Sequence, residues 1–346
     1  MASSRPVIAV DAMGGDFGPS VVVPGVVEAA RTYNVSIVLV GDKGSVGAEL
    51  KKLDIEGLDI RVEHATQVVE MGDKPSEVLR RKKDSSIQVA CQLVKNHQAD
   101  GVVSAGNSGA SVACGMFTLG RIPGVERPAL ASVLFTEKEP MVLIDVGANV
   151  DCKPYQLFQF ALMADVLARD VLGYERPRVG LLSIGEEEGK GNVQVKEAFD
   201  LFKMSSLNFV GNVEGRDIFS GEVDVVVCDG FVGNVALKLS EGLGTSLFRI
   251  LKKELSGSLT SKIANVLMFG AVQKISRLVD YAEYGGAPLL GLQSIVIVCH
   301  GASNAKAMTS AVGLATKFIV SKANDHLMEQ LTANDELTRF GKAVKY

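Results

Sequence analysis

One lysine stands between two glycines in a segment that could bind an anion. Lys190 lies in the run Gly-Glu-Glu-Glu-Gly-Lys-Gly-Asn (185–192), just before a predicted helix. A phosphate-binding P-loop has four residues between its first two glycines and a Ser or Thr after the lysine. Here only three residues separate the glycines, and Gly191 follows Lys190. The pattern therefore argues against an NTPase and favours a small anion such as phosphate. The alternative is a solvated lysine that pairs with the three neighbouring glutamates.

Five further turns combine glycine with polar residues, and each follows a short apolar run. With 185–192, the turns are 11–16, 104–108, 145–151, 229–234 and 300–304. In an open parallel sheet, ligands bind at the carboxyl ends of strands, where such turns present backbone N–H groups at helix N-termini. We expect the six turns to share one ligand-binding crevice.

Several of these residues have two interpretations. Gly106 and Gly109 would let the backbone approach an anion while Asn107 and Ser108 donate hydrogen bonds, but Ser108 could simply cap a helix. Neither the segment 105–110 nor the segment 301–305 completes the G-x-S-x-G pattern of a serine hydrolase.

The remaining turns leave similar choices open. Asp229 could fix a substrate or cap a helix, and Asn234 could polarise a carbonyl group. His300 could transfer protons or only shape its turn. The four histidines and five cysteines form no zinc-like spacing, and no G-x-G-x-x-G is present. We therefore expect no metal and no cofactor.

Composition limits the class of protein. The 346 residues are 47% hydrophobic and 22% charged, which is typical of a folded globular chain. A net charge of −4 argues against a globally basic nucleic-acid binder. The cysteines form no CxxC pair, which fits a reducing cytosol. No apolar run approaches the roughly 18 residues of a membrane span, so we expect a cytosolic protein that at most rests on a membrane surface.

The chain alternates apolar runs with helix-like segments. We predict strands at 7–10, 37–40, 101–103, 142–144, 179–182, 223–227 and 295–298, and helices at 19–32, 86–96, 108–119, 155–172, 193–203, 232–251 and 303–331. Continuous apolar strands indicate a sheet that is buried on both faces. We predict one large α/β domain over residues 1–346 with a mostly parallel sheet. A helical hairpin at about 250–284 interrupts the alternation and is expected to protrude.

Taken in order, the motifs resemble the phosphate acyltransferases of bacterial phospholipid synthesis, the PlsX family. The resemblance runs from about Val7 to about Ala305 and includes the segments 9–16, 104–110, 145–151, 185–192, 212–217, 229–234, 284–287 and 300–301. The tail from about Asn324 matches nothing in particular. The resemblance implies a Rossmann-like three-layer sandwich related to phosphotransacetylases and isocitrate dehydrogenases. It also implies that the protein moves an acyl group from acyl-(acyl carrier protein) to inorganic phosphate, without a covalent acyl-enzyme.

The same resemblance implies partners and a location. It implies a homodimer in the cytoplasm, associated peripherally with the inner face of the cell membrane, where a glycerol-3-phosphate acyltransferase consumes the acyl phosphate. A basic run, Arg80, Arg81, Lys82 and Lys83, would dock the acidic carrier protein. The apolar tip Val266, Leu267, Met268 and Phe269 would contact lipid.

Roles in the reaction follow from the chemistry of phosphate. Lys190 would bind phosphate or the developing oxyanion, and Asn234 would bind the thioester carbonyl. The expected phosphate- and substrate-binding residues are Asp11, Gly14, Gly15, Asp16, Gly106, Asn107, Ser108, Gly109, Asn149, Asp229, Gly233 and His300. Two alternatives remain: an acyl-CoA-dependent phosphotransacylase of the same fold, and a non-catalytic scaffold at the membrane. A dehydrogenase is a more distant third.

Overall fold

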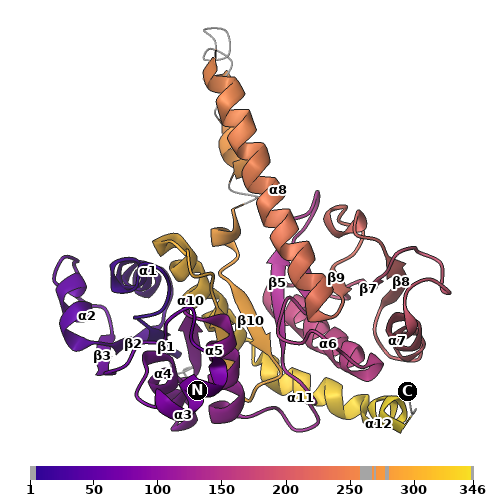
Figure 1. Cartoon of the computed structure of the whole chain (residues 1–346), viewed down its shortest axis with the longest axis horizontal. Coiled ribbons are helices and arrows are strands. Elements are labelled where there is room, and N and C mark those ends of the chain that lie inside the picture. The colour runs from indigo at the N-terminus through magenta and orange to yellow at the C-terminus, as the bar shows by residue number, and fades with distance from the viewer. Residues whose placement is uncertain (1–4, 258–266, 269, 277–279, 344–346) are drawn as a thin grey trace.

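An 11-stranded sheet runs through the body of the molecule in the order β3-β2-β1-β4-β11-β10-β5-β6-β9-β7-β8 (Figure 1). The computed structural model describes residues 5–257, 267–268, 270–276 and 280–343. The strands are β1 Val7–Asp11, β2 Ser36–Gly41, β3 Ile60–His64, β4 Gly101–Ser104, β5 Ala129–Leu134, β6 Met141–Ile144, β7 Val179–Leu182, β8 Phe209–Val213, β9 Val225–Val227, β10 Ala287–Leu290 and β11 Ile295–Val298.

Helices connect most of the strands. The α-helices are α1 Pro19–Thr32, α2 Lys43–Leu50, α3 Pro75–Arg81, α4 Ser86–Lys95, α5 Ser108–Cys114, α6 Pro154–Leu167, α7 Val193–Lys203, α8 Gly230–Gly257, α10 Ala305–Val320, α11 Ala323–Ala333 and α12 Asp335–Ala343. The π-helical turns η1 Gly115–Leu119 and η2 Ala168–Leu172 continue α5 and α6, and η3 Asp217–Phe219 and η4 Tyr281–Glu283 are short 3₁₀ turns.

The sheet is mostly parallel, as the sequence predicts, but its two halves run in opposite directions. Strands β3, β2, β1, β4 and β11 are parallel to one another, and so are β6, β9, β7 and β8. Between them, β10 is antiparallel to β11 and β5, and β5 is antiparallel to β6. Three antiparallel pairings in a row reverse the strand direction. The carboxyl ends of β1 and β6 therefore lie at opposite edges of the sheet.

Side chains alternate between two buried cores, one on each face of the sheet. On β6, Val142 and Ile144 pack into the core that includes α1, α6, α7 and α10 residues, whereas Met141 and Leu143 pack into the core that includes α4 and α5 residues. Helices thus cover both faces, which confirms the three-layer α/β sandwich.

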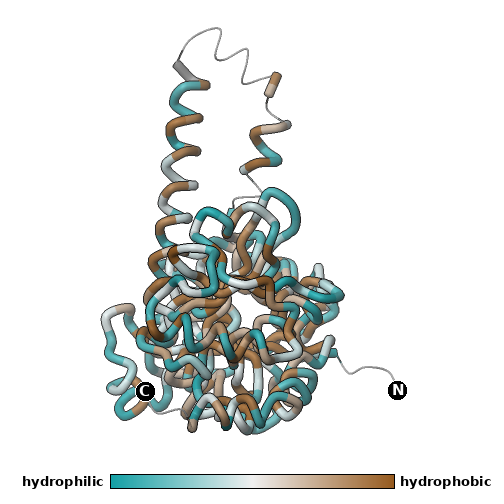
Figure 2. The backbone as a smooth tube through the Cα atoms, turned by 90° about the vertical axis from the view of Figure 1, so that its right-hand side faces the viewer, coloured by the Kyte–Doolittle hydropathy of each residue, from teal (hydrophilic) through white to brown (hydrophobic). Residues whose placement is uncertain are grey.

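Helix α8 projects from the body, and a second helical segment, residues 267–268 and 270–276, returns from its far end toward the body (Figures 1 and 2). The helix is continuous over Gly230–Gly257, and Leu239 is already 69% exposed. The excursion therefore begins earlier than the expected residue 250, because α8 extends past the body without a break.

The C-terminal region differs from the single helix predicted for 303–331. Lys322 adopts a left-handed backbone conformation with φ of 55°, which ends α10 and starts α11. Helices α11 and α12 then pack on α6.

Candidate active site

The six glycine-containing turns form two clusters rather than one row. Turns 11–16, 104–108 and 300–304 follow β1, β4 and β11, whereas turns 145–151, 185–192 and 229–234 follow β6, β7 and β9. Because the two halves of the sheet run in opposite directions, the clusters lie at opposite strand ends. The expectation that all six turns share equivalent positions is therefore wrong.

Asp11 organises the first cluster. Its carboxylate accepts hydrogen bonds from the Met13 N–H and, at 2.8 Å, from the Ser104 hydroxyl. Burial raises the pKa of Asp11 despite these bonds. A Cβ on Gly14 would lie 2.7 Å from the Gly106 nitrogen, so only glycine lets these two turns approach so closely.

Backbone bonds tie the third turn of this cluster to the first. The Asp16 N–H donates to the Gly301 carbonyl at 2.8 Å, and the exposed His300 accepts at Nδ1 from the Ala302 N–H at 3.1 Å. Gly15 has a φ of +87°, a conformation that glycine adopts freely. Turns 11–16 and 300–304 therefore hold each other in place.

Asn107 and Ser108 begin α5 in this cluster. The Asn107 side chain accepts from the Ala110 N–H and donates to the Met71 and Asp73 carbonyls at 2.8 and 3.0 Å. Its polar atoms thus cap the helix and hold the neighbouring loop. Ser108 is exposed, and its role in binding phosphate stays a prediction.

Asp145 organises the second cluster. The fully buried carboxylate accepts five hydrogen bonds, from the backbone N–H groups of Leu130, Gly147, Ala148 and Asn149 and from the Asn149 side chain. Burial raises the pKa of Asp145. The Asn149 Nδ2 also donates to the Pro128 carbonyl at 2.8 Å. The 145–151 turn is thereby fixed to the segment that leads into β5.

The first turn of α8 packs directly against this turn. A Cβ on Gly233 would lie 1.9 Å from the Asp145 carbonyl oxygen, and the Gly230 N–H donates to the Asn149 carbonyl at 2.7 Å. Asp229 accepts from the Val232 N–H at 2.9 Å, as a helix cap does. Asn234 donates to the Val146 carbonyl at 3.0 Å. An amide nitrogen has two N–H groups, so one remains for a ligand.

Lys190 lies in the turn after β7, the strand next to β9 in the sheet. Its amine is exposed and forms no hydrogen bond or ion pair with any residue that the structure describes. Two of the three neighbouring glutamates pair elsewhere, because Glu188 binds Lys203 at 2.9 Å and Glu186 binds Arg216 at 3.2 Å. Within the described residues, Lys190 therefore forms no ion pair with the glutamates of its own turn.

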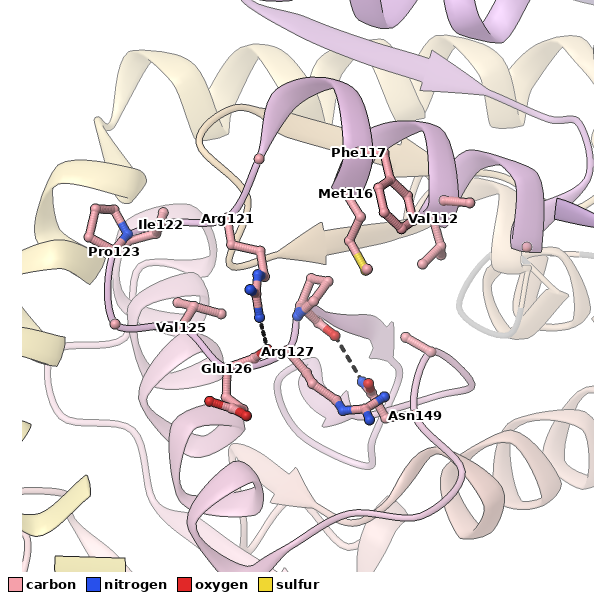
Figure 3. A pocket seen from close by; sticks show the side chains of 16 residues that line it. Val112, Met116, Phe117, Arg121, Ile122, Pro123, Val125, Glu126, Arg127 and Asn149 are labelled. Carbon is pink, nitrogen blue, oxygen red and sulfur yellow. Dashed lines mark hydrogen bonds between the residues drawn. The ribbon is translucent and has the colours of Figure 1, made fainter. Parts of the chain in front are cut away.

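A cleft reaches from the start of α5 to the 145–151 turn (Figure 3). This α5 cleft has a volume of about 930 Å³. Its lining comprises Gly109, Val112, Ala113, Met116, Phe117, the segment 120–128, Ala148 and Asn149. Most of these lining residues were not predicted from the sequence. The 3- and 4-residue spacing of 109, 112, 113, 116, 117 and 120 is also typical of a buried helix face.

The cysteines are poorly suited to act as nucleophiles. Burial raises the pKa of Cys152, beside the 145–151 turn, to about 12, and does the same for Cys114 and Cys299. Burial also raises the pKa of Cys91 and Cys228. Since the thiolate is the reactive form, these thiols stay protonated near neutral pH.

The predicted docking and lipid-contact residues lie outside both clusters. Arg80, Arg81 and Lys83 are exposed, whereas Lys82 is bound to Asp73 at 2.5 Å. At the predicted tip, Leu267 and Met268 are exposed, and Val266 and Phe269 lie outside the described residues. Within the described chain, no helix is long and apolar enough to cross a membrane, and no His, Cys, Asp or Glu cluster could hold a metal.

Solved structures define the class of fold. The chain superimposes on a phosphotransacetylase from Streptococcus pyogenes with a TM-score of 0.62 at 16% identity, covering 93% of this chain and 95% of the other. It matches the EutD phosphotransacetylase from Staphylococcus aureus with a TM-score of 0.60 at 17% identity, covering 92% and 94%. The architecture is therefore that of the phosphotransacetylase-like α/β proteins.

Sequence comparison defines the family more narrowly. Residues 7–325 match the family model described as fatty acid synthesis protein. The chain is 65% identical to a phosphate acyltransferase of Nitratidesulfovibrio vulgaris over 340 residues, 98% of this chain and 99% of the relative. It is also 65% identical to one from Oleidesulfovibrio alaskensis over 346 residues, the whole of both chains. The chain belongs to this phosphate acyltransferase family and is an acyltransferase.

We predict that Gly233→Ala disturbs the second cluster, because its methyl group would collide with the Asp145 carbonyl. The expected loss in the free energy of unfolding is about 1–3 kcal/mol. Gly242→Ala on the same helix is the matched control, since a Cβ there meets no atom within 4 Å. It should stabilise the helix by up to about 1 kcal/mol. Urea unfolding of both variants measures the difference, and equal behaviour would disprove the close packing.

Proposed function

We propose that the protein transfers the fatty acyl group of acyl-(acyl carrier protein) to inorganic phosphate. A phosphate oxygen attacks the thioester carbonyl carbon, the C–S bond breaks, and the proton of hydrogen phosphate passes to the departing thiolate. The products are an acyl phosphate and free carrier protein thiol. Membership of the phosphate acyltransferase family supports this reaction.

The observation that carries the proposal is the unpaired Lys190 amine in a turn that follows the strand next to the one preceding Asn234. The two residues lie in the turns that follow the neighbouring parallel strands β7 and β9. Lys190 would neutralise the attacking phosphate or the oxyanion, and the second N–H of Asn234 would bind the thioester carbonyl. Fixed donors of this kind stabilise developing charge without reorganising during the reaction.

The other predicted residues would support these two. Gly233 and Asn149 hold the Asn234 helix turn against the 145–151 turn, and Asp229 caps the same helix. In the first cluster, Gly106, Gly109 and Ser108 stay predicted phosphate-binding residues, but this cluster lies at the opposite strand ends from Lys190 and Asn234.

Direct attack by phosphate fits the state of the thiols. The raised pKa of Cys152, whose thiol donates to the Asn149 carbonyl in the 145–151 turn, keeps this cysteine protonated. Phosphate would therefore act as the nucleophile itself, once it is oriented and partly desolvated.

A basic surface supports docking of an acidic carrier protein. Arg80, Arg81 and Lys83 make no side-chain hydrogen bond or ion pair within the described part of the chain. Such unpaired charges steer an acidic partner and raise its association rate. Lys82 contributes less, because Asp73 and the Val68 carbonyl already bind its amine.

One observation favours a second candidate substrate. The fold is shared with phosphotransacetylases, so an acyl-CoA thioester is the alternative acyl donor. Dependence on carrier protein separates the two candidates.

The projecting helices support assembly as a homodimer. Helix α8 carries a stripe of exposed apolar side chains: Phe231, Val232, Val235, Leu239, Leu243, Leu247, Ile250 and Leu251. A long helix with one exposed apolar stripe buries it against other helices. We infer that a second copy of the chain covers this stripe in a homodimer.

The end of the projection would then meet the inner face of the cell membrane. Leu267 is 81% exposed, and Met268 is exposed beside it. Apolar residues at such a tip insert into the interfacial region of a bilayer. Peripheral contact would deliver acyl phosphate to a membrane glycerol-3-phosphate acyltransferase.

The reaction is tested with palmitoyl carrier protein, phosphate and the purified protein, trapping acyl phosphate with hydroxylamine. We predict phosphate-dependent acyl hydroxamate with the wild-type protein and losses of at least about 100-fold for Lys190→Ala and Asn234→Ala. Lys196→Ala is a matched control, because this lysine is exposed on α7, which follows the same turn. Product from palmitoyl-CoA alone would favour the alternative donor, and no product from either would refute the transferase.

Membrane contact is tested by sedimentation with vesicles of phosphatidylglycerol and phosphatidylethanolamine. Replacing Leu267 and Met268 with aspartate should reduce vesicle binding at least about tenfold, because charged groups resist burial among lipid tails. Activity in solution should persist. Met204→Asp, at an exposed apolar position on the body, should bind as the wild type does. Unchanged binding by the double variant would exclude this tip as the contact.

A further inference from the structure

The α5 cleft has one apolar wall, formed by a single helix face. Val112, Met116 and Phe117 project into it from α5 and η1 (Figure 3). Phe117 is 70% exposed, which is unusual for a large aromatic side chain that could pack on the body. Ile122, Pro123 and Val125 extend the apolar lining at the other side. These side chains form an apolar surface, which suits part of a hydrocarbon chain.

The opposite end of the cleft is cationic. Arg127 is exposed, and its guanidinium makes no hydrogen bond or ion pair with a described residue. In Figure 3 its side chain runs toward Asn149. Arg121 donates only to the backbone carbonyl of Glu126. Two guanidinium groups thus line the cleft, and that of Arg127 has no carboxylate partner among the described residues.

The acidic residue in the lining does not cancel this charge. Glu126 pairs with Lys342 of α12 at 3.2 Å, and this ion pair lowers the pKa of Glu126. Lys342 also lies 5.4 Å from the centre of the Tyr155 ring. Lys342 and the charge of Arg121 thus act on the Glu126 carboxylate, and Arg127 remains available to an anion.

The cationic end adjoins the expected reaction centre. Asn149 and Ala148 line the cleft, and the adjacent Gly147 lies against the Asn234 side chain, where a Cβ would be 2.8 Å from Nδ2. A carbonyl group bound by Asn234 would therefore lie near the end of the cleft that Ala148 and Asn149 line.

We propose that the α5 cleft binds the acyl phosphate, with its phosphate on Arg127 and its acyl chain along Val112, Met116 and Phe117. This assignment rests on the proposed function. An acyl phosphate is an amphiphile with a dianionic head and a hydrocarbon tail, which matches both ends of the cleft. The volume of about 930 Å³ lies within the range of pockets that enclose small ligands.

The same binding site would hold the acyl group before and after its transfer to phosphate. The acyl chain would lie along the apolar wall while the acyl group is still bound as a thioester. Arg127 would bind the phosphate as the new C–O bond forms. Guanidinium groups bind phosphate through paired N–H donors, which fixes the orientation of the anion. Arg127 is thus a substrate-binding residue that sequence motifs did not single out.

Binding is measured by calorimetry on the full chain with two β-ketophosphonates, in which a methylene group replaces the bridging oxygen of palmitoyl phosphate or butyryl phosphate. Arg127→Gln should weaken both analogues at least about tenfold, because a charge-assisted contact is lost. Ala113→Trp should fill the wall, weaken the palmitoyl analogue at least about tenfold and leave the butyryl analogue nearly unchanged. Arg176→Gln, another exposed arginine away from the cleft, should bind both analogues normally.

The outcomes separate the two proposals. If the wild-type protein forms acyl phosphate but the Arg127 and Ala113 variants bind both analogues like the wild type, the cleft assignment fails and the transferase stands. If the wild-type protein forms no acyl phosphate, the transferase fails, while the analogue affinities still decide whether the cleft takes such amphiphiles. A thermal melt of each variant confirms that it is folded.

Discussion

The Asp145 carboxylate accepts five hydrogen bonds in a site with no exposed surface, and the candidate active site depends on them. They hold the 145–151 turn in one conformation, so that Asn149 reaches the Pro128 carbonyl. Because this turn is fixed, the first turn of α8 can pack against it, with Gly233 next to the Asp145 carbonyl. One buried side chain, that of Asp145, therefore fixes the positions of both Asn234 and the segment that carries Arg127.

The reversal of the sheet explains why the site has two sides. Because β10 and β5 pair in antiparallel fashion, the strands of the two halves of the sheet run in opposite directions. The two sets of glycine turns therefore lie at opposite ends of the strands. Helix α5 begins in the first cluster, and its face lines the cleft that ends at the 145–151 turn. The cleft thus connects the start of α5 with the 145–151 turn, which would lie at the same strand ends if the whole sheet were parallel.

The apolar runs were sufficient to predict a mostly parallel α/β sheet buried on both faces, because β2, β4, β6 and β11 are buried along their whole length. The three-layer sandwich was implied by the family resemblance. The sequence could not reveal the reversal. Strand β10 contains Pro288, which argues against a strand inside a sheet, and β5 pairs with residues distant in sequence. Lys190 and Asn234 could be singled out because glycine turns surround them. Arg121 and Arg127 could not, since their availability depends on Lys342 holding Glu126 more than 200 residues away.

The role of Asp145 in organising the candidate active site is tested by the rate of acyl phosphate formation by Asp145→Asn. The variant keeps the volume of the side chain but replaces one acceptor oxygen with a donor, and each unsatisfied N–H costs about 1–3 kcal/mol. We predict a folded protein of lower stability whose rate of acyl phosphate formation falls at least about 100-fold, because Asn234 loses its fixed position. A variant with the wild-type rate would contradict the claim that this buried carboxylate organises the site.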